Sequence, residues 1–175
     1  PPRAVRRPRD VGVAQRPRQR VPPNAGRQEL EKVLAELGKW AVHWMYDELD
    51  PHDVDPVMLT WWMHRRVDRE RLPPGRVVIQ FDHTAPQTMA IWMVLDRREP
   101  SVCLQHPGFD TDVLVTTTTP AMAEVFQGYR SWSSSVDDGS ITVSGAPSLV
   151  RSLPKWFLWS PFADDARRVT ASRAR

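Results

Sequence analysis

Cysteine is almost absent from this sequence: Cys103 is the only one in 175 residues. A single thiol excludes an internal disulfide and is typical of proteins in a reducing cytoplasm. No apolar run approaches the roughly 20 residues that a membrane-spanning helix needs, and the Pro- and Arg-rich start contains no apolar signal segment. We therefore expect a soluble, cytoplasmic protein with no membrane partner. Because the first residue is Pro1 and not Met, we also expect a fragment or a processed chain.

The sequence also lacks the usual catalytic and metal-binding motifs. It has no glycine-rich phosphate loop, no GxSxG nucleophile elbow and no paired cysteines. The acidic segment DELDPHDVDP has neither the central glycine nor the closing glutamate of a calcium loop. Two histidines at predicted strand ends, His83 and His106, could approach each other and are the one candidate pair for catalysis or metal binding. Polar residues at strand ends are the simpler explanation for both. The sequence therefore predicts no enzyme activity, no metal and no cofactor.

Basic residues are concentrated at the two ends of the chain. Residues 1–28 hold 8 Arg and 1 Asp, and residues 166–175 hold 4 Arg and no acid. Of the 24 basic and 21 acidic residues, 12 basic and 20 acidic ones remain for residues 29–165, which are therefore acidic. We predict a disordered Pro/Arg-rich leader over 1–25 and a frayed basic tail over 164–175. Both arms can contact nucleic-acid phosphates without sequence preference, or serve as an unstructured leader and tail only.

Residues 26–48 are predicted to form an amphipathic helix. Its apolar residues recur at i, i+3, i+4, i+7, i+11 and i+14, which makes one stripe: Leu30, Val33, Leu34, Leu37, Ala41 and Trp44. The acidic, proline-containing segment that follows predicts a linker. A second helix is predicted over Pro56–Val67, with proline in its first turn.

From Arg76 onward the apolar period changes to two, which predicts five strands: Arg76–His83, Met89–Leu95, Ser101–His106, Thr111–Thr118 and Ser140–Ser144. Met89–Leu95 is almost continuously apolar, which indicates a strand covered on both faces. Short links favour an antiparallel meander. Helices are predicted from Thr119 (as a hydroxyl N-cap), from Trp132 and from Pro147, with Pro154 interrupting the last. The predicted fold class is α+β: a five-stranded, mainly antiparallel sheet covered by helices and preceded by one long amphipathic helix.

Large aromatic residues are abundant in the acidic part of the chain. All 8 tryptophans fall between Trp40 and Trp159. Such residues fill a core, or they line a cavity for an apolar ligand, because ligand pockets are mostly aromatic and aliphatic. Composition and periodicity leave both readings open.

Several segments between Met58 and Ala163 together resemble a known family: LTWWMHRRVD, LPPGRVVIQFDH, HPGFDTDVLVT, VFQGYRSW, DGSITVSG and LPKWFLWSPFA. Their order and spacing are similar to the sterol-carrier-protein-type (type 2) lipid-binding domain that follows a winged helix in some HxlR-type transcriptional regulators. GRQELEKVLAELGKWA (Gly26–Ala41) resembles the closing helix of that winged helix, which packs in the family's dimer interface. The helix-turn-helix and wing that precede this helix in the family are missing from this sequence, so DNA recognition does not carry over.

The resemblance implies an apolar tunnel over the sheet and binding of a lipid-like ligand without a cofactor. We expect residues 56–163 to form this ligand-binding domain, as the effector domain of a transcriptional regulator. The alternative is a DNA-binding regulator in which the domain is mainly structural or dimerising, with weak DNA contacts through the basic arms. The pattern predicts ten ligand-binding residues: Trp61, Ile79, Phe81, Trp92, Val115, Met122, Phe126, Trp132, Trp156 and Phe157. For a homodimer, six residues are predicted at the interface: Leu30, Val33, Leu34, Leu37, Trp40 and Trp44.

Overall fold

The computed structural model describes residues 24–45 and 53–173. Residues 1–23 of the predicted disordered leader and most of the predicted acidic linker lie outside these ranges, and the leader's last residue, Ala25, is the first residue of a helix. The chain divides into two compact units, residues 1–35 and residues 36–175. Helix α1 (Ala25–Trp44) begins in the first unit and ends in the second. No described helix is long and apolar enough to cross a membrane.

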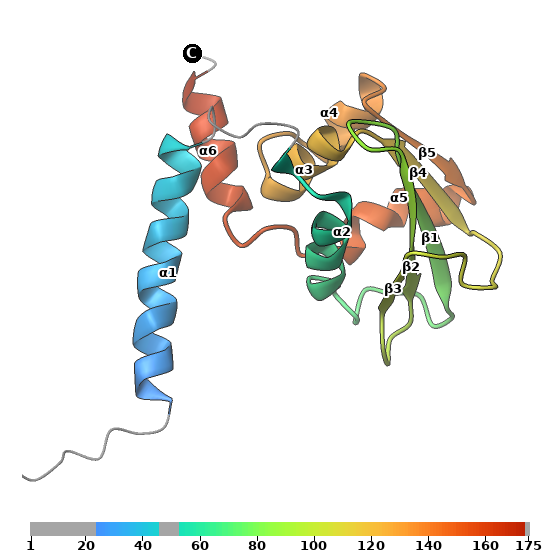
Figure 1. Ribbon diagram of the computed structural model, residues 1–175, viewed down its shortest axis with the longest axis horizontal. Helices are drawn as coiled ribbons and strands as arrows, with labels where there is room; N and C mark the ends of the chain where they lie inside the picture. Colours follow the sequence, from blue (N-terminus) through green and yellow to red (C-terminus); the bar gives the residue numbers. More distant parts are fainter. Residues whose placement is uncertain (1–23, 46–52, 174–175) are drawn as a thin grey trace, which may run out of the picture. The chain divides into compact units, whose positions relative to one another are not determined.

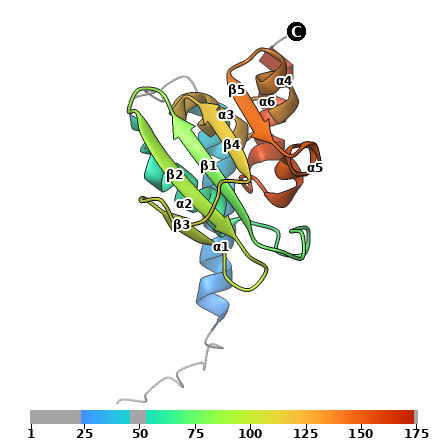
Figure 2. The same cartoon turned by 90° about the vertical axis from the view of Figure 1, so that its right-hand side faces the viewer.

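A five-stranded mixed sheet forms the centre of the second unit, in the order β3-β2-β1-β4-β5 (Figure 2). The strands are β1 (Val77–His83), β2 (Met89–Leu95), β3 (Ser101–Cys103), β4 (Val113–Thr117) and β5 (Ile141–Gly145). The α+β class and all five predicted strands are confirmed; Met89–Leu95 matches at both ends, and the ends of the other strands differ by at most three residues.

The predicted meander is wrong at its fourth strand. β1, β2 and β3 do follow one another as antiparallel neighbours, but β4 pairs with β1 in parallel and not with β3. The link that crosses from β3 is fixed to the start of β1 by Asp112, whose carboxylate accepts a hydrogen bond from the Val78 amide (2.8 Å). The Asp112 amide in turn donates to the Val78 carbonyl (2.9 Å). These two bonds hold β4 beside β1, because they set the register before the strand begins.

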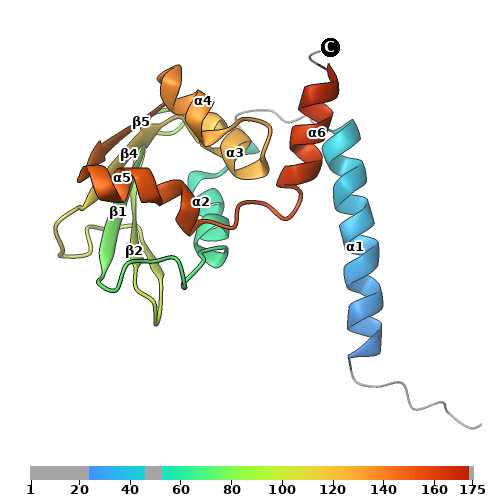
Figure 3. The same ribbon diagram turned by 180° about the vertical axis from the view of Figure 1, so that it is seen from behind.

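The helices of the second unit cover one face of the sheet. Figures 1 and 3 show α2, α3 and α5 on the same side of the strands. The elements are α2 (Pro56–Arg65), α3 (Thr119–Gln127), α4 (Trp132–Asp137), α5 (Pro147–Ser152), a 3₁₀ helix (Leu153–Trp156) and α6 (Ala163–Arg173). Proline at the start of α2, α3 and α5 suits the first turn, where no amide needs an intrahelical partner.

Three helix predictions need correction. The N-cap of α3 is Thr118 and not Thr119: its hydroxyl accepts from the Ala121 amide at 3.2 Å. Thr119 is then free to bond to His83. The second helix ends at Arg65, two residues early, since the chain there pairs with Phe157 through Val67. The tail after Asp164 is not frayed but forms α6, whose Ala166 is fully buried.

The core lies between the sheet and these helices. The helix-facing side chains of four strands are buried to 1% exposure or less: Ile79, Phe81, Ile91, Met93, Val113, Val115 and Ile141. The opposite face is not fully covered, because Ala90 and Trp92 of β2 are only half-buried there. The prediction that β2 is covered on both faces is therefore wrong. On this face the amide oxygen of Gln80 accepts from Trp92 (3.2 Å) and from Thr111 (3.1 Å), and its amide nitrogen donates to the Asp82 carboxylate (2.8 Å).

Candidate ligand-binding site

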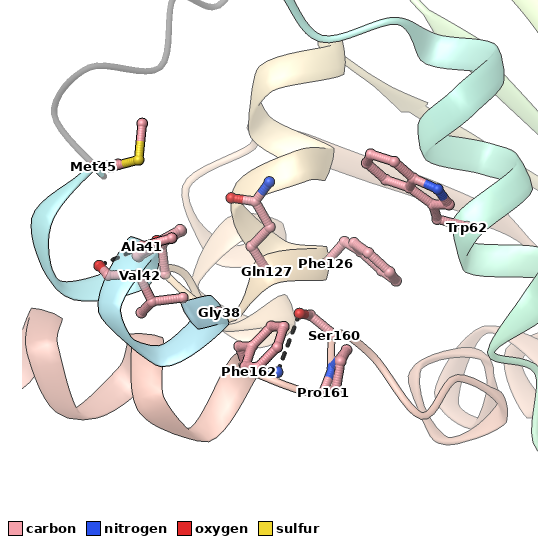
Figure 4. A pocket seen from close by; sticks show the side chains of 11 residues that line it. Gly38, Ala41, Val42, Met45, Trp62, Phe126, Gln127, Ser160, Pro161 and Phe162 are labelled. Atoms are coloured by element: carbon pink, nitrogen blue, oxygen red, sulfur yellow. Dashed lines mark hydrogen bonds between the residues drawn. The ribbon is translucent and has the colours of Figure 1, made fainter. Parts of the chain in front are cut away.

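An apolar pocket of about 370 Å³ lies within the second unit (Figure 4). Four segments form its wall: the end of α1, one residue of α2, the end of α3 and the link before α6. The lining residues are Gly38, Ala41, Val42, Met45, Trp62, Phe126, Gln127, Tyr129, Ser160, Pro161 and Phe162. Its volume is within the range of small-molecule sites, roughly 300–1,000 Å³.

Helix α1 contributes one of its two apolar faces to this pocket. Gly38, Ala41, Val42 and Met45 recur at i, i+3, i+4 and i+7, so they share a face. At Gly38 the absence of a side chain matters, because an added Cβ would overlap the ring of Phe162. A glycine in a helix interior costs up to about 1 kcal/mol relative to alanine. Because Gly38 has no side chain, the Phe162 ring lies directly against the backbone of α1.

The end of α3 holds the opposite wall in place. Gly128 closes α3 with a left-handed backbone (φ 92°), and its Cα lies so close to the Ala163 backbone that a Cβ would come within 2.6 Å of the Ala163 Cα. The Ser160 amide donates to the Phe126 carbonyl (2.9 Å). The Tyr129 hydroxyl donates to the Val42 carbonyl of α1 (3.4 Å). Backbone contacts of this kind fix the wall more firmly than side-chain packing alone.

The chemistry of the pocket is that of a binding site. None of its eleven lining residues carries a charge, and the polar side-chain groups are the amide of Gln127, the hydroxyls of Tyr129 and Ser160 and the indole N–H of Trp62. The described residues contain no group of three or more His, Cys, Asp or Glu that could hold a metal ion. The arrangement suits an apolar molecule with one or two hydrogen-bonding groups.

Only one of the ten predicted ligand-binding residues, Phe126, lines this pocket. Six others are buried to 4% exposure or less in the contiguous core: Ile79, Phe81, Val115, Met122, Trp156 and Phe157. Their side chains fill the space between the sheet and the helices. Trp156 also borders a second hollow, with Arg71 and Lys155 at its edge.

The remaining three predicted residues are dispersed over the unit. Trp61 is exposed on α2, and the Arg65 guanidinium lies over its ring, with 5.3 Å between the Arg65 Cζ and the centre of the Trp61 ring. Trp92 lies on the sheet face opposite the helices. Trp132 is half-buried against Trp159, with the ring centres 6.0 Å apart. None of the three faces the pocket.

Most of the residues that form the pocket do not stand out in the apolar pattern of the sequence. Ala41 belongs to the predicted apolar stripe of α1, whereas the sequence pattern places Gly38, Val42 and Met45 on no particular face. One local signal was present, since a glycine inside a helical pattern usually marks a close contact. The contributions of Gln127 and of the link at residues 160–162 leave no trace in periodicity, because they depend on the tertiary fold.

The two histidines of the candidate pair do not meet. His83 points to the helix side of the sheet, where its Nδ1 is 3.0 Å from the Thr119 hydroxyl. Burial lowers the pKa of the His83 imidazole, against a smaller opposing effect of Asp82. His106 lies against Trp92 on the other face, with the ring centres 5.5 Å apart. The two histidines, which the sequence left as a possible pair, are therefore separated by the sheet: His83 faces the helices, and His106 lies beyond the end of β3 on the other face.

The six residues predicted for a dimer interface lie on the outward face of α1. All are between 52% and 64% exposed. Leu30, Val33 and Leu34 belong to the first compact unit, and Leu37, Trp40 and Trp44 to the second. The homodimer stays a prediction.

The geometry defines an α+β protein with an uncharged pocket beside a helix-covered sheet. No protein-family model matches the chain, and no curated protein matches it either. Among solved structures, it is similar to a stereoselective inverting sec-alkylsulfatase from Pseudomonas sp. (TM-score 0.51, 14% identity, 63% of this chain and 17% of that one). It thus spans less than a fifth of that enzyme's length.

Two sterol carrier structures are also among its structural neighbours. One is a ubiquinone synthesis protein, UbiJ-SCP2 (TM-score 0.39, 14% identity, 82% of this chain and 98% of that one). The other is the sterol carrier protein domain 2 of Helicoverpa armigera (TM-score 0.41, 16% identity, 66% of this chain and 85% of that one). The winged-helix regulator part of the sequence resemblance finds no support in these comparisons.

Proposed function

We propose that this chain binds a small apolar molecule in the pocket between the end of α1 and the end of α3, and that it does so without catalysis. The observation that carries the proposal is the wall of eleven uncharged residues around about 370 Å³. A lipid-like ligand is also what the sequence resemblance implies. Apolar surface removed from water contributes roughly 25 cal/mol per Å², so an enclosed apolar ligand gains most of its affinity from burial.

Binding without chemistry is supported by the side chains that face the pocket. Proton transfer or nucleophilic attack needs a His, Cys, Lys, Tyr, Asp, Glu or an activated Ser at the reacting atom. The one tyrosine of the wall, Tyr129, donates its hydroxyl hydrogen to the Val42 carbonyl (3.4 Å). The one serine of the wall, Ser160, uses its Oγ to accept a hydrogen bond from the Phe162 amide (3.2 Å). We also propose that the protein resides in a reducing cytoplasm. Its Cys103 on β3 is a free, half-buried thiol, which fits that compartment.

The test is a fluorescence titration with diphenylhexatriene, a probe without polar atoms that emits in apolar sites. We expect saturable binding by the wild type and a Kd at least tenfold higher in Ala41→Trp, whose side chain would occupy the pocket. The matched control is Lys39→Trp, on the same helix turn but outside the wall, and it should bind as the wild type does. Absence of saturable binding by the wild type, or equal loss in both variants, would contradict the proposal.

We also propose that the outward face of α1 joins two copies of the chain. Leu30, Leu37 and Trp44 are seven residues apart, as are Val33 and Trp40, which is the heptad spacing of paired helices. Sedimentation equilibrium should show a dimer for the wild type and a monomer for Leu37→Glu. Lys32→Glu, which changes charge on the same helix outside the stripe, should leave the dimer intact. A wild type that stays monomeric at high concentration would refute the pairing.

A role in transcription, as an effector domain or as a DNA-binding regulator, stays a prediction from the sequence resemblance. Binding to DNA that falls with salt and ignores sequence would show only the electrostatics of the basic arms. A sequence-specific complex of this chain would support the regulator.

A further inference from the structure

Among the described residues, the wall of the pocket offers no partner for a charged ligand. Its wall contains no Lys, Arg, His, Asp or Glu. Transfer of an ionised group out of water without a counter-charge is far more costly than transfer of a neutral polar group, which needs only one hydrogen bond. The wall therefore disfavours an ionised ligand much more strongly than a neutral ligand that carries a polar group.

Gln127 is the one side chain of the wall that offers a ligand an amide donor and a carbonyl acceptor together, whereas the Trp62 indole N–H offers a donor only. Gln127 is the last residue of α3 and is half-buried. In Figure 4 its amide lies between the side chains of Met45 and Trp62. No described residue forms a hydrogen bond with this amide, whereas Ser160 and Tyr129 both bond to backbone groups. A glutamine amide has donors and an acceptor, so it can bond to a carbonyl, an ester or a hydroxyl.

We propose that the pocket selects neutral amphiphiles, with Gln127 bonding to their single polar group, and excludes the ionised carboxylates of the same chain length. This inference rests on the proposed function, because it names the ligand class of the same pocket. The volume of about 370 Å³ is near the lower limit for small-molecule sites, so the ligand is a medium-length alcohol, ester or comparable neutral molecule.

The test uses displacement of diphenylhexatriene by three competitors with the same ten-carbon chain: 1-decanol, methyl decanoate and sodium decanoate, at pH 8. We expect the alcohol and the ester to displace the probe at concentrations at least tenfold lower than the carboxylate. Equal displacement by the three, or a preference for decanoate, would overturn the inference and leave the proposed function standing. Absence of probe binding would instead refute the proposed function and the inference together.

Two variants at Gln127 test its role directly. In Gln127→Leu the wall loses its hydrogen-bonding group, so the affinity for decanol relative to that for diphenylhexatriene should fall severalfold. In Gln127→Lys the wall gains a counter-charge, so the preference should shift toward decanoate by tenfold or more. An unchanged decanol-to-decanoate ratio in Gln127→Lys would show that the polar group of the ligand does not reach this residue, and would overturn the assignment.

Discussion

Gly128 ends α3 and lies against the backbone at the start of α6, so replacing it with alanine should cost more than the same substitution at a glycine with open space around it, such as Gly139. Its φ of 92° lies in the left-handed region, which costs a residue with a Cβ roughly 1–2 kcal/mol. In addition, the new Cβ would come within 2.5 Å of the Ala163 carbonyl oxygen and 2.6 Å of the Ala163 Cα. Both atoms belong to the backbone and cannot rotate away, so the start of α6 must move.

The magnitude follows from these two effects together. Overpacking costs about 1–3 kcal/mol in addition to the conformational strain, so we expect Gly128→Ala to lower the free energy of unfolding by about 3 kcal/mol. For a chain of this size each kcal/mol lowers the melting temperature by roughly 2–4 °C, which makes a shift of roughly 6–12 °C. Urea unfolding followed by circular dichroism, at constant m-value, gives the free energy directly.

The matched control is Gly139→Ala. Gly139 has a similar φ of 79°, but nothing lies within 4 Å of the position of its Cβ. It should therefore show the conformational strain alone, roughly 1–2 kcal/mol. Equal losses in the two variants would refute the argument, because the contact between Gly128 and Ala163 would then have no measurable cost.

Three further predictions concern stability. Burial lowers the pKa of the His83 imidazole, so below about pH 6.5 the unfolded state binds more protons than the folded state, and the free energy of unfolding decreases as the pH falls. Urea unfolding at pH 7.5 and 5.5 should therefore show a smaller loss of stability at the lower pH in His83→Gln than in the wild type, and an equal loss would exclude this histidine as the cause. Thr118→Ala removes the N-cap bond of α3 (3.2 Å) and should cost about 1 kcal/mol, whereas Thr118→Ser should recover most of it in the same assay. Asp112→Ala leaves the Val78 amide without its 2.8 Å acceptor and should cost about 1–3 kcal/mol at pH 7.5; a loss below about 0.5 kcal/mol would mean that this bond does not fix β4 beside β1.

Some features of the pocket could not be predicted because they depend on contacts between distant segments. Gly38 and Phe162 are far apart in sequence, and nothing in the periodicity of α1 indicates that an aromatic ring lies on its glycine. The ten predicted ligand-binding residues are apolar as expected, but most of them fill the core that the pattern itself required. Apolarity predicts burial, and it does not distinguish a packed interior from the wall of a cavity.

The sequence by itself determined where the five strands lie, where α2, α4 and α5 begin and which side of β1 is buried, because period and capping act over a few residues. Ile79 and Phe81 were placed on the buried face by alternation alone, and both are buried. Only the tertiary structure decided that β4 pairs with β1 and that the pocket lies at the end of α1, since a loop of given length permits several pairings. Local patterns fix which face of an element avoids water, whereas long-range packing decides what that face meets.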